Sequence, residues 1–203
     1  MPSVTTILDY HMEPELVAWY LKKGKVAATR LSDEAKQIGT WMDIVVKADC
    51  LDRLPVHQNL LPGLEERVAS CKAAWQRFKQ ENPDAVGAMQ VFEGELTEGD
   101  LIGYPDFLLM AGEGVLDLKT SRFLQPKHWT QVCQYRRMLK TPTFVALLRL
   151  DKETGEYEYK TIEDIDVLRY EEKVFDAYRV AYDHAQVVRE RTRQILEEEV
   201  LAL

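Results

Sequence analysis

The sequence predicts a mixed α/β fold in which helices precede a mixed sheet and a long helix follows it. Apolar residues recur at helical spacing in residues 1–82, short apolar runs separated by turns occupy residues 85–162, and helical spacing returns in residues 163–203. We expect these three parts to form a single domain over residues 1–203.

The composition is that of an ordinary soluble globular protein, with 46% hydrophobic and 30% charged residues among 203. The start MPSVTTILDY resembles no secretory or mitochondrial leader, and no apolar run is long enough to cross a bilayer. We therefore expect a cytoplasmic protein without a membrane partner. Cys50, Cys71 and Cys133 are far apart in the sequence, which predicts buried thiols and no iron–sulfur cluster.

Four helices are expected in the first part of the chain. Ser3 can cap a helix that ends at Tyr10, and a second helix over residues 13–23 ends at Gly24. Ser32, followed by two acidic residues, predicts the start of a longer helix that ends near Asp52. A fourth amphipathic helix is expected over residues 62–80, which the sequence ENPD closes.

The sheet is expected to begin with an antiparallel meander of three strands. Its strands are AMQVFEGEL, LIGYPDFLLM and GVLDLKT, and the turns EGD and AGEG connect them. A helix over residues 125–140 opens with Pro126. The buried strand TPTFVALLRL follows, then ETGEYEYKTI after a turn at Gly155, and the last helix is expected from about Tyr170.

The strand GVLDLKT carries two chemically active side chains. Strand side chains alternate between faces, so Asp117 and Lys119 project from one side and Leu116 and Leu118 from the other. Asp106 follows a bend at Pro105, and a hairpin would bring it beside Asp117.

Two carboxylates at this distance repel each other unless a cation lies between them. Their hard oxygen atoms suit Mg²⁺ or Mn²⁺. Lys119 would then be able to orient an attacking water and stabilise charge on a phosphate. Asp106, Asp117 and Lys119 together predict metal-assisted hydrolysis of a phosphodiester.

A basic segment follows these residues, although the net charge of the chain is −8. Residues 119–140 contain six lysines and arginines and no acidic residue. The alternative is a solvated helix face, which is a common use of such a run. If the segment binds DNA, the residues expected to contact it are Arg122, Lys127, Arg136 and Arg137.

Three motifs in order resemble the PD-(D/E)XK nuclease superfamily in its RecB-like branch. They are Gly103 to Asp106, then Asp117 to Ser121, then Gln131 to Tyr135. The opening PSVTTIL and the pair Gly39 and Thr40 are also similar to compact RecB-like exonucleases of the mitochondrial genome maintenance type. The likeness spans residues 2–150.

The resemblance implies a restriction-endonuclease-like αβββαβ core and a role for each motif residue. Asp106 and Asp117 are implied as metal ligands together with the carbonyl of Leu118, and Lys119 is implied as the catalytic lysine.

The third motif lies on a helix. Gln131 and Tyr135 are four residues apart, so both can face the strand that carries Lys119 and touch DNA or the metal shell. The alternative is that Tyr135 is a core residue and Gln131 caps it.

One position departs from the family pattern. Where the family has a histidine ligand four residues after the glycine, this chain has Asp43. Aspartate is a competent, harder ligand for Mg²⁺ or Mn²⁺, so we expect a changed metal preference. An exposed helix residue is the alternative for Asp43, and Glu93 and Glu95 are weaker candidate ligands.

The sequence therefore predicts a metal-dependent DNA exonuclease acting on single-stranded or end-frayed DNA in repair or recombination. A structure-dependent endonuclease and a catalytically weak nucleic-acid-binding descendant are the alternatives. No phosphate loop of the GxxxxGK[ST] type occurs, so a helicase or recombination protein would be a separate chain. Trp41, Trp129 and Tyr104 are expected to stack bases or to be buried, and His128 to meet phosphate or to be an ordinary helix residue.

Overall fold

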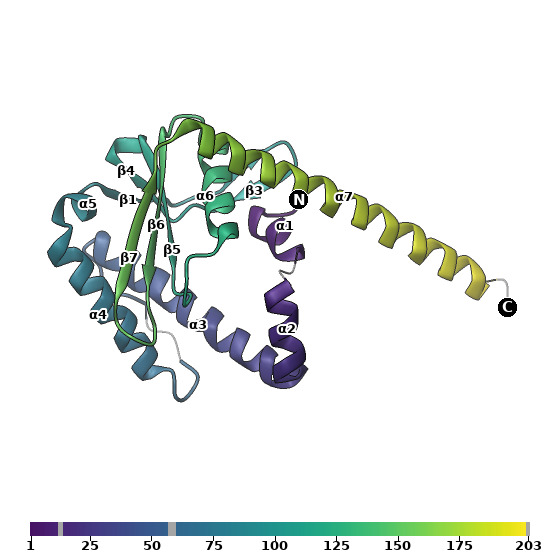
Figure 1. The fold of residues 1–203 in the computed structure, drawn as a ribbon, viewed down its shortest axis with the longest axis horizontal. Coiled ribbons are helices and arrows are strands. Elements are labelled where there is room, and N and C mark those ends of the chain that lie inside the picture. The colour runs from purple at the N-terminus through teal and green to yellow at the C-terminus, as the bar shows by residue number, and fades with distance from the viewer. Residues whose placement is uncertain (12–13, 57–59, 202–203) are drawn as a thin grey trace.

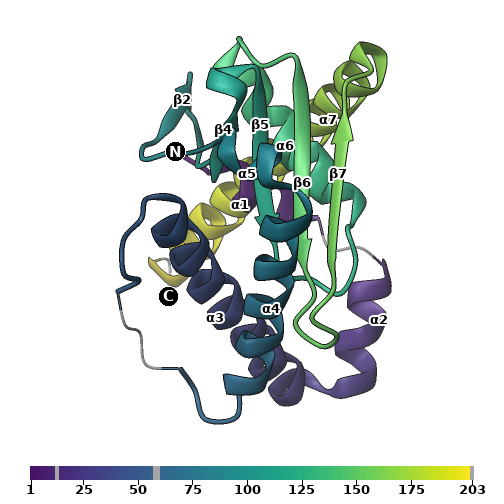
Figure 2. The same ribbon diagram turned by 90° about the vertical axis from the view of Figure 1, so that its left-hand side faces the viewer.

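The computed structural model describes residues 1–11, 14–56 and 60–201, and it shows a five-stranded sheet between two layers of helices (Figures 1 and 2). Helices α3 and α4 lie on one face of the sheet, and α1, α6 and α7 lie on the other. The expected mixed α/β fold with a long C-terminal helix is confirmed.

Five helices precede the sheet: α1 (Val4–Tyr10), α2 (Pro14–Lys23), α3 (Lys25–Cys50), α4 (Glu65–Glu81) and α5 (Pro83–Gly87). Ser3 caps α1 as expected, since its hydroxyl accepts a hydrogen bond from the Thr6 backbone N–H. The expected start of the second helix, Glu13, lies outside the described residues. Gly24 ends α2 with a φ of 79°.

The start of α3 was expected at Ser32 and lies at Lys25 instead. The Gly24 carbonyl accepts the hydrogen bond of the Ala28 N–H, so the helix begins directly after the glycine. Nothing in KVAATRL breaks a helix, and Ser32 lies inside it.

Three other helices, α4, α5 and α7, differ from expectation. Helix α4 begins at Glu65, and ENPD opens α5, because Pro83 occupies the first helical position, where no N–H is needed. Helix α7 (Ile165–Leu201) begins earlier than Tyr170 because the Asp164 carboxylate accepts hydrogen bonds from the N–H groups of the first turn.

The main sheet has the order β1-β4-β5-β6-β7. Its strands are β1 (Met89–Val91), β4 (Phe107–Leu109), β5 (Gly114–Lys119), β6 (Phe144–Leu150) and β7 (Tyr157–Ile162). Only β5 and β6 are parallel, and α6 (Pro126–Leu139) connects them. The expected αβββαβ order is present: a helix precedes the antiparallel strands β1, β4 and β5, and α6 and the parallel strand β6 follow them.

The first two strands of the expected meander are each divided in two. The hairpin pairs β1 with β4 near its base, and β2 (Leu96–Glu98) with β3 (Leu101–Gly103) at its tip. Between these pairs the chain bends at Gly94 and at Asp106, and Pro105 before it has no N–H to donate to a partner strand. The tip leaves the sheet and packs against α6, where a Cβ on Gly103 would lie 3.1 Å from the Tyr135 ring.

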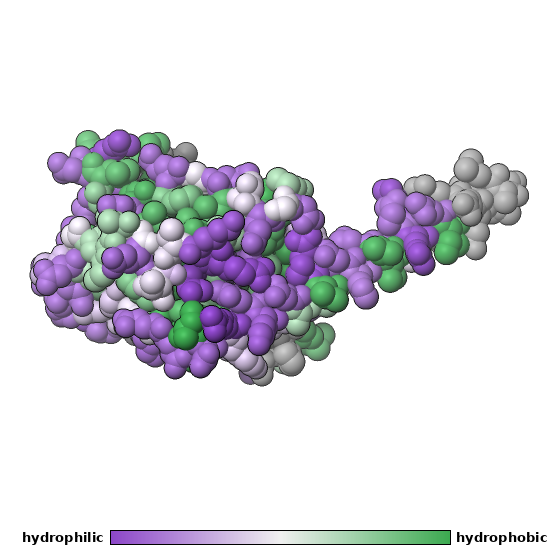
Figure 3. Space-filling view, turned by 90° about the horizontal axis from the view of Figure 1, so that it is seen from above, coloured by the Kyte–Doolittle hydropathy of each residue, from purple (hydrophilic) through white to green (hydrophobic). Residues whose placement is uncertain are grey.

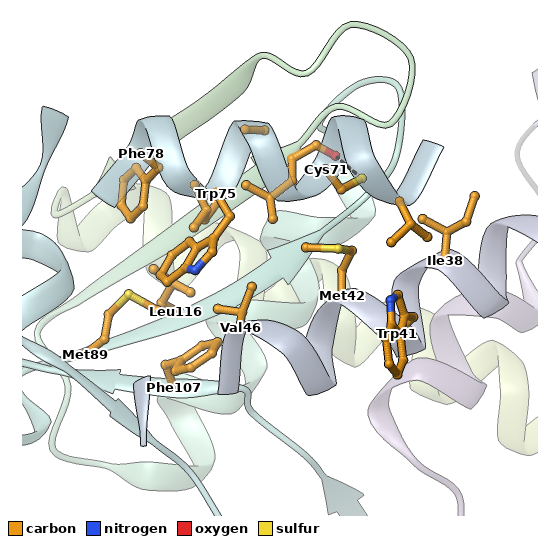
Figure 4. Packing of buried hydrophobic residues seen from close by; sticks show 14 of the residues in the cluster. Ile38, Trp41, Met42, Val46, Cys71, Trp75, Phe78, Met89, Phe107 and Leu116 are labelled. Carbon is orange, nitrogen blue, oxygen red and sulfur yellow. Dashed lines mark hydrogen bonds between the residues drawn. The ribbon is translucent and has the colours of Figure 1, made fainter. Parts of the chain in front are cut away.

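The core on one face of the sheet lies between α3, α4 and the strands (Figure 4). Its largest fully buried side chains include Trp75 and Phe78 from α4 and Phe107 and Leu116 from the sheet. The Cys71 thiol lies 3.6 Å from the Leu150 carbonyl, so this cysteine is a buried free thiol as expected.

The core on the other face is formed by α1, α6 and the first half of α7. Beyond this contact α7 continues away from the body (Figures 1 and 3), and residues 187–195 are all exposed. Among the described residues, no helix is long and apolar enough to span a membrane.

The close contact between β5 and β6 leads to a first prediction. A Cβ at Gly114 would lie 2.3 to 2.7 Å from three ring atoms of Phe144, its register partner. Gly114→Ala should therefore lower the free energy of unfolding by about 1–2 kcal/mol, measured by urea denaturation, because the ring must leave its place.

The control is Gly87→Ala at the end of α5, where a Cβ would meet nothing within 4 Å. This variant should be as stable as the wild type or slightly more stable. Equal stability of the two variants would contradict the prediction.

Candidate active site

Asp117 and Lys119 lie at the carboxyl end of β5. Both project toward α6, since the intervening Leu118 and the preceding Leu116 pack in the core with α3 and α4. The Asp117 side chain is 4% exposed, and its Oδ2 lies 2.5 Å from the Lys119 ammonium. This Oδ2 atom is buried, and the Lys119 ammonium is its partner.

Asp106 directly precedes β4 and lies opposite Asp117. The register pairs Phe107 with Leu116, and one further step along both strands brings the two aspartates together. The Asp106 Oδ2 accepts a hydrogen bond of 2.8 Å from the Leu118 N–H. The expectation that a hairpin would place the two carboxylates side by side is confirmed by this pairing.

Helix α3 brings a third carboxylate to the same place. Gly39 approaches the residue that follows β5 closely, since a Cβ there would lie 3.4 Å from the Thr120 hydroxyl. Asp43 is one turn further along this face of α3, and Lys47 one turn beyond it. The Lys47 ammonium lies 2.8 Å from Asp43 Oδ1 and 3.5 Å from Asp106 Oδ1.

Burial and mutual repulsion dominate the electrostatics of the three carboxylates. Burial raises the pKa of Asp117 to about 6, and the charges of Asp106 and Asp43 add to the increase, whereas Lys119 opposes it. Burial and the charge of Asp106 also raise the pKa of Asp43, against the influence of Lys47. Burial lowers the pKa of Lys47, but the charges of Asp106 and Asp43 outweigh burial and raise it overall.

Gln131 holds the Lys119 ammonium from α6. Its Oε1 accepts a 2.8 Å hydrogen bond from Lys119 Nζ. Its Nε2 donates to the hydroxyl of Tyr135 at 2.9 Å and to that of Thr5 at 3.0 Å. Burial raises the pKa of Tyr135, with the charge of Asp117 contributing, so its hydroxyl stays neutral. Tyr135 is buried and joined to the site through Gln131.

Two basic residues of α6 face α7. Arg136 lies 2.6 Å from Glu172, and both side chains are 15% exposed. Arg137 lies 2.7 Å from Asp176. These ion pairs hold α7 against α6, and a DNA contact for either arginine stays a prediction.

The other two expected DNA-contact residues lie nearer the surface. Lys127 pairs with Asp9 at 3.2 Å. Arg122 is exposed on the loop after β5, with its guanidinium 5.2 Å from the centre of the Phe123 ring.

The remaining candidates divide between core and surface. Trp41 is 7% exposed, and Tyr104 is 51% exposed and donates a 2.6 Å hydrogen bond to Glu95. His128 is buried, and its Nδ1 accepts a hydrogen bond from the Gln125 N–H, so it is an ordinary capping residue of α6. Burial, together with Lys119 and Lys127, lowers the His128 pKa to about 3.

Three members of this region were not singled out from the sequence. Lys47 could have been found, because it is four residues after Asp43 and shares its helix face. Phe123, 64% exposed, follows Lys119 by four residues, but exposure has no local sequence signal. Thr5 is distant in the sequence and reaches Gln131 only through the packing of α1 against α6.

The donor set suits a hard divalent cation, although the side chains are not arranged around one. Among the described residues, no three His, Cys, Asp or Glu side chains form a group that could hold a metal ion as they stand. Asp43 Oδ1 and Asp117 Oδ2 are nevertheless buried, and the partners at 2.8 and 2.5 Å are the ammonium groups of Lys47 and Lys119. Carboxylate oxygens of this kind are the ligands that Mg²⁺ and Mn²⁺ prefer, so the residues fit such an ion chemically.

Three solved structures show a distant likeness to this chain. The complex of LHK-Exo with dAMP matches with a TM-score of 0.44 and 14% identity, covering 78% of this chain and 86% of that one. The protein SSO0001 matches with a TM-score of 0.43 and 12% identity, covering 92% and 75% of the two chains. A phage-related exonuclease from Haemophilus somnus matches with a TM-score of 0.40 and 11% identity, covering 73% and 81%.

No protein-family model matches the sequence, and no curated protein matches it. The chemistry of the site therefore has to be inferred from the side chains of this chain.

The raised pKa of Asp117 predicts how stability depends on pH. A carboxyl group with a higher pKa in the folded than in the unfolded protein stabilises the fold when protonated, and this stabilisation is lost as the pH rises through about 6. In EDTA at pH 7, Asp117→Asn should raise the free energy of unfolding by about 1–3 kcal/mol, because it removes a buried charge.

The difference from the wild type should shrink as the pH falls from 7 toward 4, in urea denaturation at each pH. Asp33→Asn, at an exposed position of α3, is the control and should show no such trend. A stabilisation by Asp117→Asn that is equal at all pH values would contradict the assigned cause.

Proposed function

We propose that this chain is a metal-dependent deoxyribonuclease that hydrolyses phosphodiester bonds. One observation supports the proposal above all. The carboxylates of Asp43, Asp106 and Asp117 lie close to the ammonium group of Lys119 at the carboxyl end of β5. Carboxylates for a cation and a positioned ammonium for a phosphate are the groups that this hydrolysis requires.

We assign Asp106, Asp117 and Asp43, with the carbonyl of Leu118, to the binding of Mg²⁺ or Mn²⁺. The Asp106 carboxylate is held in place by the Leu118 N–H, which leaves its other oxygen able to accept a cation. A bound divalent ion supplies positive charge that activates water and stabilises the negative charge of the phosphate in the transition state.

Lys119 is assigned as the catalytic lysine. An ammonium group has three N–H donors, of which one is directed to Gln131 and another faces Asp117. The remaining donor can orient an attacking water or contact a phosphate oxygen. Because Gln131 is itself fixed by Tyr135 and Thr5, the ammonium has little freedom to leave this position.

The loop after β5 supports single-stranded or frayed DNA as substrate. Ser121 donates a 2.7 Å hydrogen bond to the Phe123 carbonyl, and Arg149 donates one of 3.1 Å to the Arg122 carbonyl. The backbone is thus anchored while the Phe123 ring is presented to solvent, with Arg122 beside it. An exposed aromatic ring next to a cation is suited to stacking an unpaired base beside a phosphate.

Within this class, we propose an exonuclease of the RecB-like branch, and membership of the mitochondrial genome maintenance type stays a prediction. A separate helicase or recombination protein would supply its single-stranded ends. The pairing of Lys47 with two carboxylates favours the alternative of a catalytically weak DNA-binding descendant, which the same assay tests.

The central test is digestion of end-labelled linear single-stranded DNA, linear duplex and circular DNA with Mg²⁺ or Mn²⁺. Lys119→Ala should lower the rate on linear DNA about 100-fold or more, because the charge stabilisation at the phosphate is lost. Lys160→Ala, at an exposed lysine of β7, is the matched control and should keep the wild-type rate.

Equal rates for Lys119→Ala and the wild type would rule out the assigned catalysis. Circular DNA should stay intact, and its cleavage would favour the endonuclease instead. DNA binding without cleavage by the wild type would favour the non-catalytic alternative.

The loop is tested by Phe123→Ala. Loss of one stacking contact should weaken the binding of single-stranded DNA about 5- to 100-fold, measured by fluorescence anisotropy in EDTA, and leave duplex binding less affected. Tyr170→Ala, which removes another exposed aromatic ring, is the control. Equal losses for both variants would argue against stacking by Phe123.

A further inference from the structure

Lys47 lies among Asp43, Asp106 and Asp117, although it belongs to none of the three motifs. Its ammonium contacts Asp43 Oδ1 at 2.8 Å and Asp106 Oδ1 at 3.5 Å, so it bridges α3 and the bend before β4. It also lies 6.0 Å from the centre of the Phe107 ring. The side chain is only 25% exposed, and it is therefore held from several sides.

The charges around Lys47 are nearly balanced. Asp43, Asp106 and Asp117 contribute three negative charges, and Lys47 and Lys119 contribute two positive charges. Asp43 and Lys47 together add no net charge. The Asp43 carboxylate therefore joins the cluster without increasing the net negative charge of the cluster. Lys119 faces Asp117 and Gln131, which leaves Lys47 as the cation of the Asp43 and Asp106 pair.

We propose that Lys47 is a resident cation of the metal site, which competes with the divalent ion for Asp43 and Asp106. This inference rests on the proposed metal-dependent function. The Leu118 N–H donates to Asp106 Oδ2, and the Lys47 ammonium contacts the other oxygen of this carboxylate, Oδ1. Asp43 and Asp106 would hold the divalent ion, and their oxygens in contact with the ammonium would be freed if Lys47 moved away.

Two consequences follow from this competition. Without a divalent ion, Lys47 reduces the repulsion between the carboxylates and keeps α3 against the hairpin bend. With a divalent ion bound, the nearby ammonium would weaken the binding of that ion, because like charges a few ångströms apart repel each other. Lys47 therefore acts as a positioning residue that sets metal affinity.

A structural ion pair is the alternative. If Lys47 only joined α3 to the bend, its removal would loosen the site and weaken metal binding. The competition predicts the opposite sign, so one binding measurement separates the two roles.

The test is titration of metal-free protein with Mn²⁺ at pH 7.5, in which free Mn²⁺ is measured by electron paramagnetic resonance. Lys47→Met keeps an unbranched side chain one heavy atom shorter and removes the charge, and we expect Mn²⁺ to bind on the order of 10-fold more tightly. Lys47→Gln is the second variant, in case the methionine does not fold. Lys79→Met is the matched control, because Lys79 lies on α4 and pairs with Asp49, which projects from a different side of the same end of α3 than Lys47.

Asp117→Asn is titrated in parallel to test the metal site itself. Unchanged or weaker binding by both Lys47 variants, together with loss of binding in Asp117→Asn, would overturn the role of Lys47 and leave the metal site standing. If neither the wild type nor the Lys47 variants bind Mn²⁺, both proposals are wrong. Binding by a Lys47 variant alone would support the competition strongly.

Discussion

The hydrogen bond from the Leu118 N–H to the Asp106 carboxylate is the contact on which the site depends. It joins the bend of the hairpin to β5. This strand carries Asp117 and Lys119 on the face opposite to Leu118. The bend exists because the hairpin leaves the sheet at Gly94 and Pro105 and lays its tip on α6. One local change of direction thus positions a carboxylate and also brings the hairpin to the helix that carries Gln131.

The electrostatics of the site reduce the stability of the fold. Asp117 is buried beside two other carboxylates, which raises its pKa to about 6, so ionisation at neutral pH costs free energy. Lys119 and Lys47 offset part of this cost. A site that collects negative charge in a buried place is poorly suited to a purely structural role and well suited to binding a cation.

The basic residues of α6 show why charge in a sequence is an incomplete guide to nucleic-acid binding. Arg136 and Arg137 belong to a run without acidic residues, but they pair with Glu172 and Asp176 of α7, more than thirty positions along the chain, and Arg137 also pairs with Glu98 of β2. The loop with Arg122 and Phe123 is the part of this run that keeps an exposed cation beside an exposed ring.

Apart from α5, the sequence alone determined the order of helices and strands, and it determined the shared face of Asp117 and Lys119, because these follow from local periodicity. It also placed Asp106 beside Asp117, since a hairpin of this length allows little else. It missed the start of α3 at Lys25 and the division of the hairpin strands, where propensities are weak and packing against α6 decides.

The resemblance offered Asp43 as a candidate ligand, but only the tertiary structure showed that it joins the cluster and that Lys47 and Thr5 join it too. Asp43 and Lys47 enter it because Gly39 lets α3 approach Thr120, and Thr5 reaches Gln131 because α1 packs on α6. Such contacts depend on how layers of the fold pack, and a packing distance is not encoded in the spacing of residues along one segment.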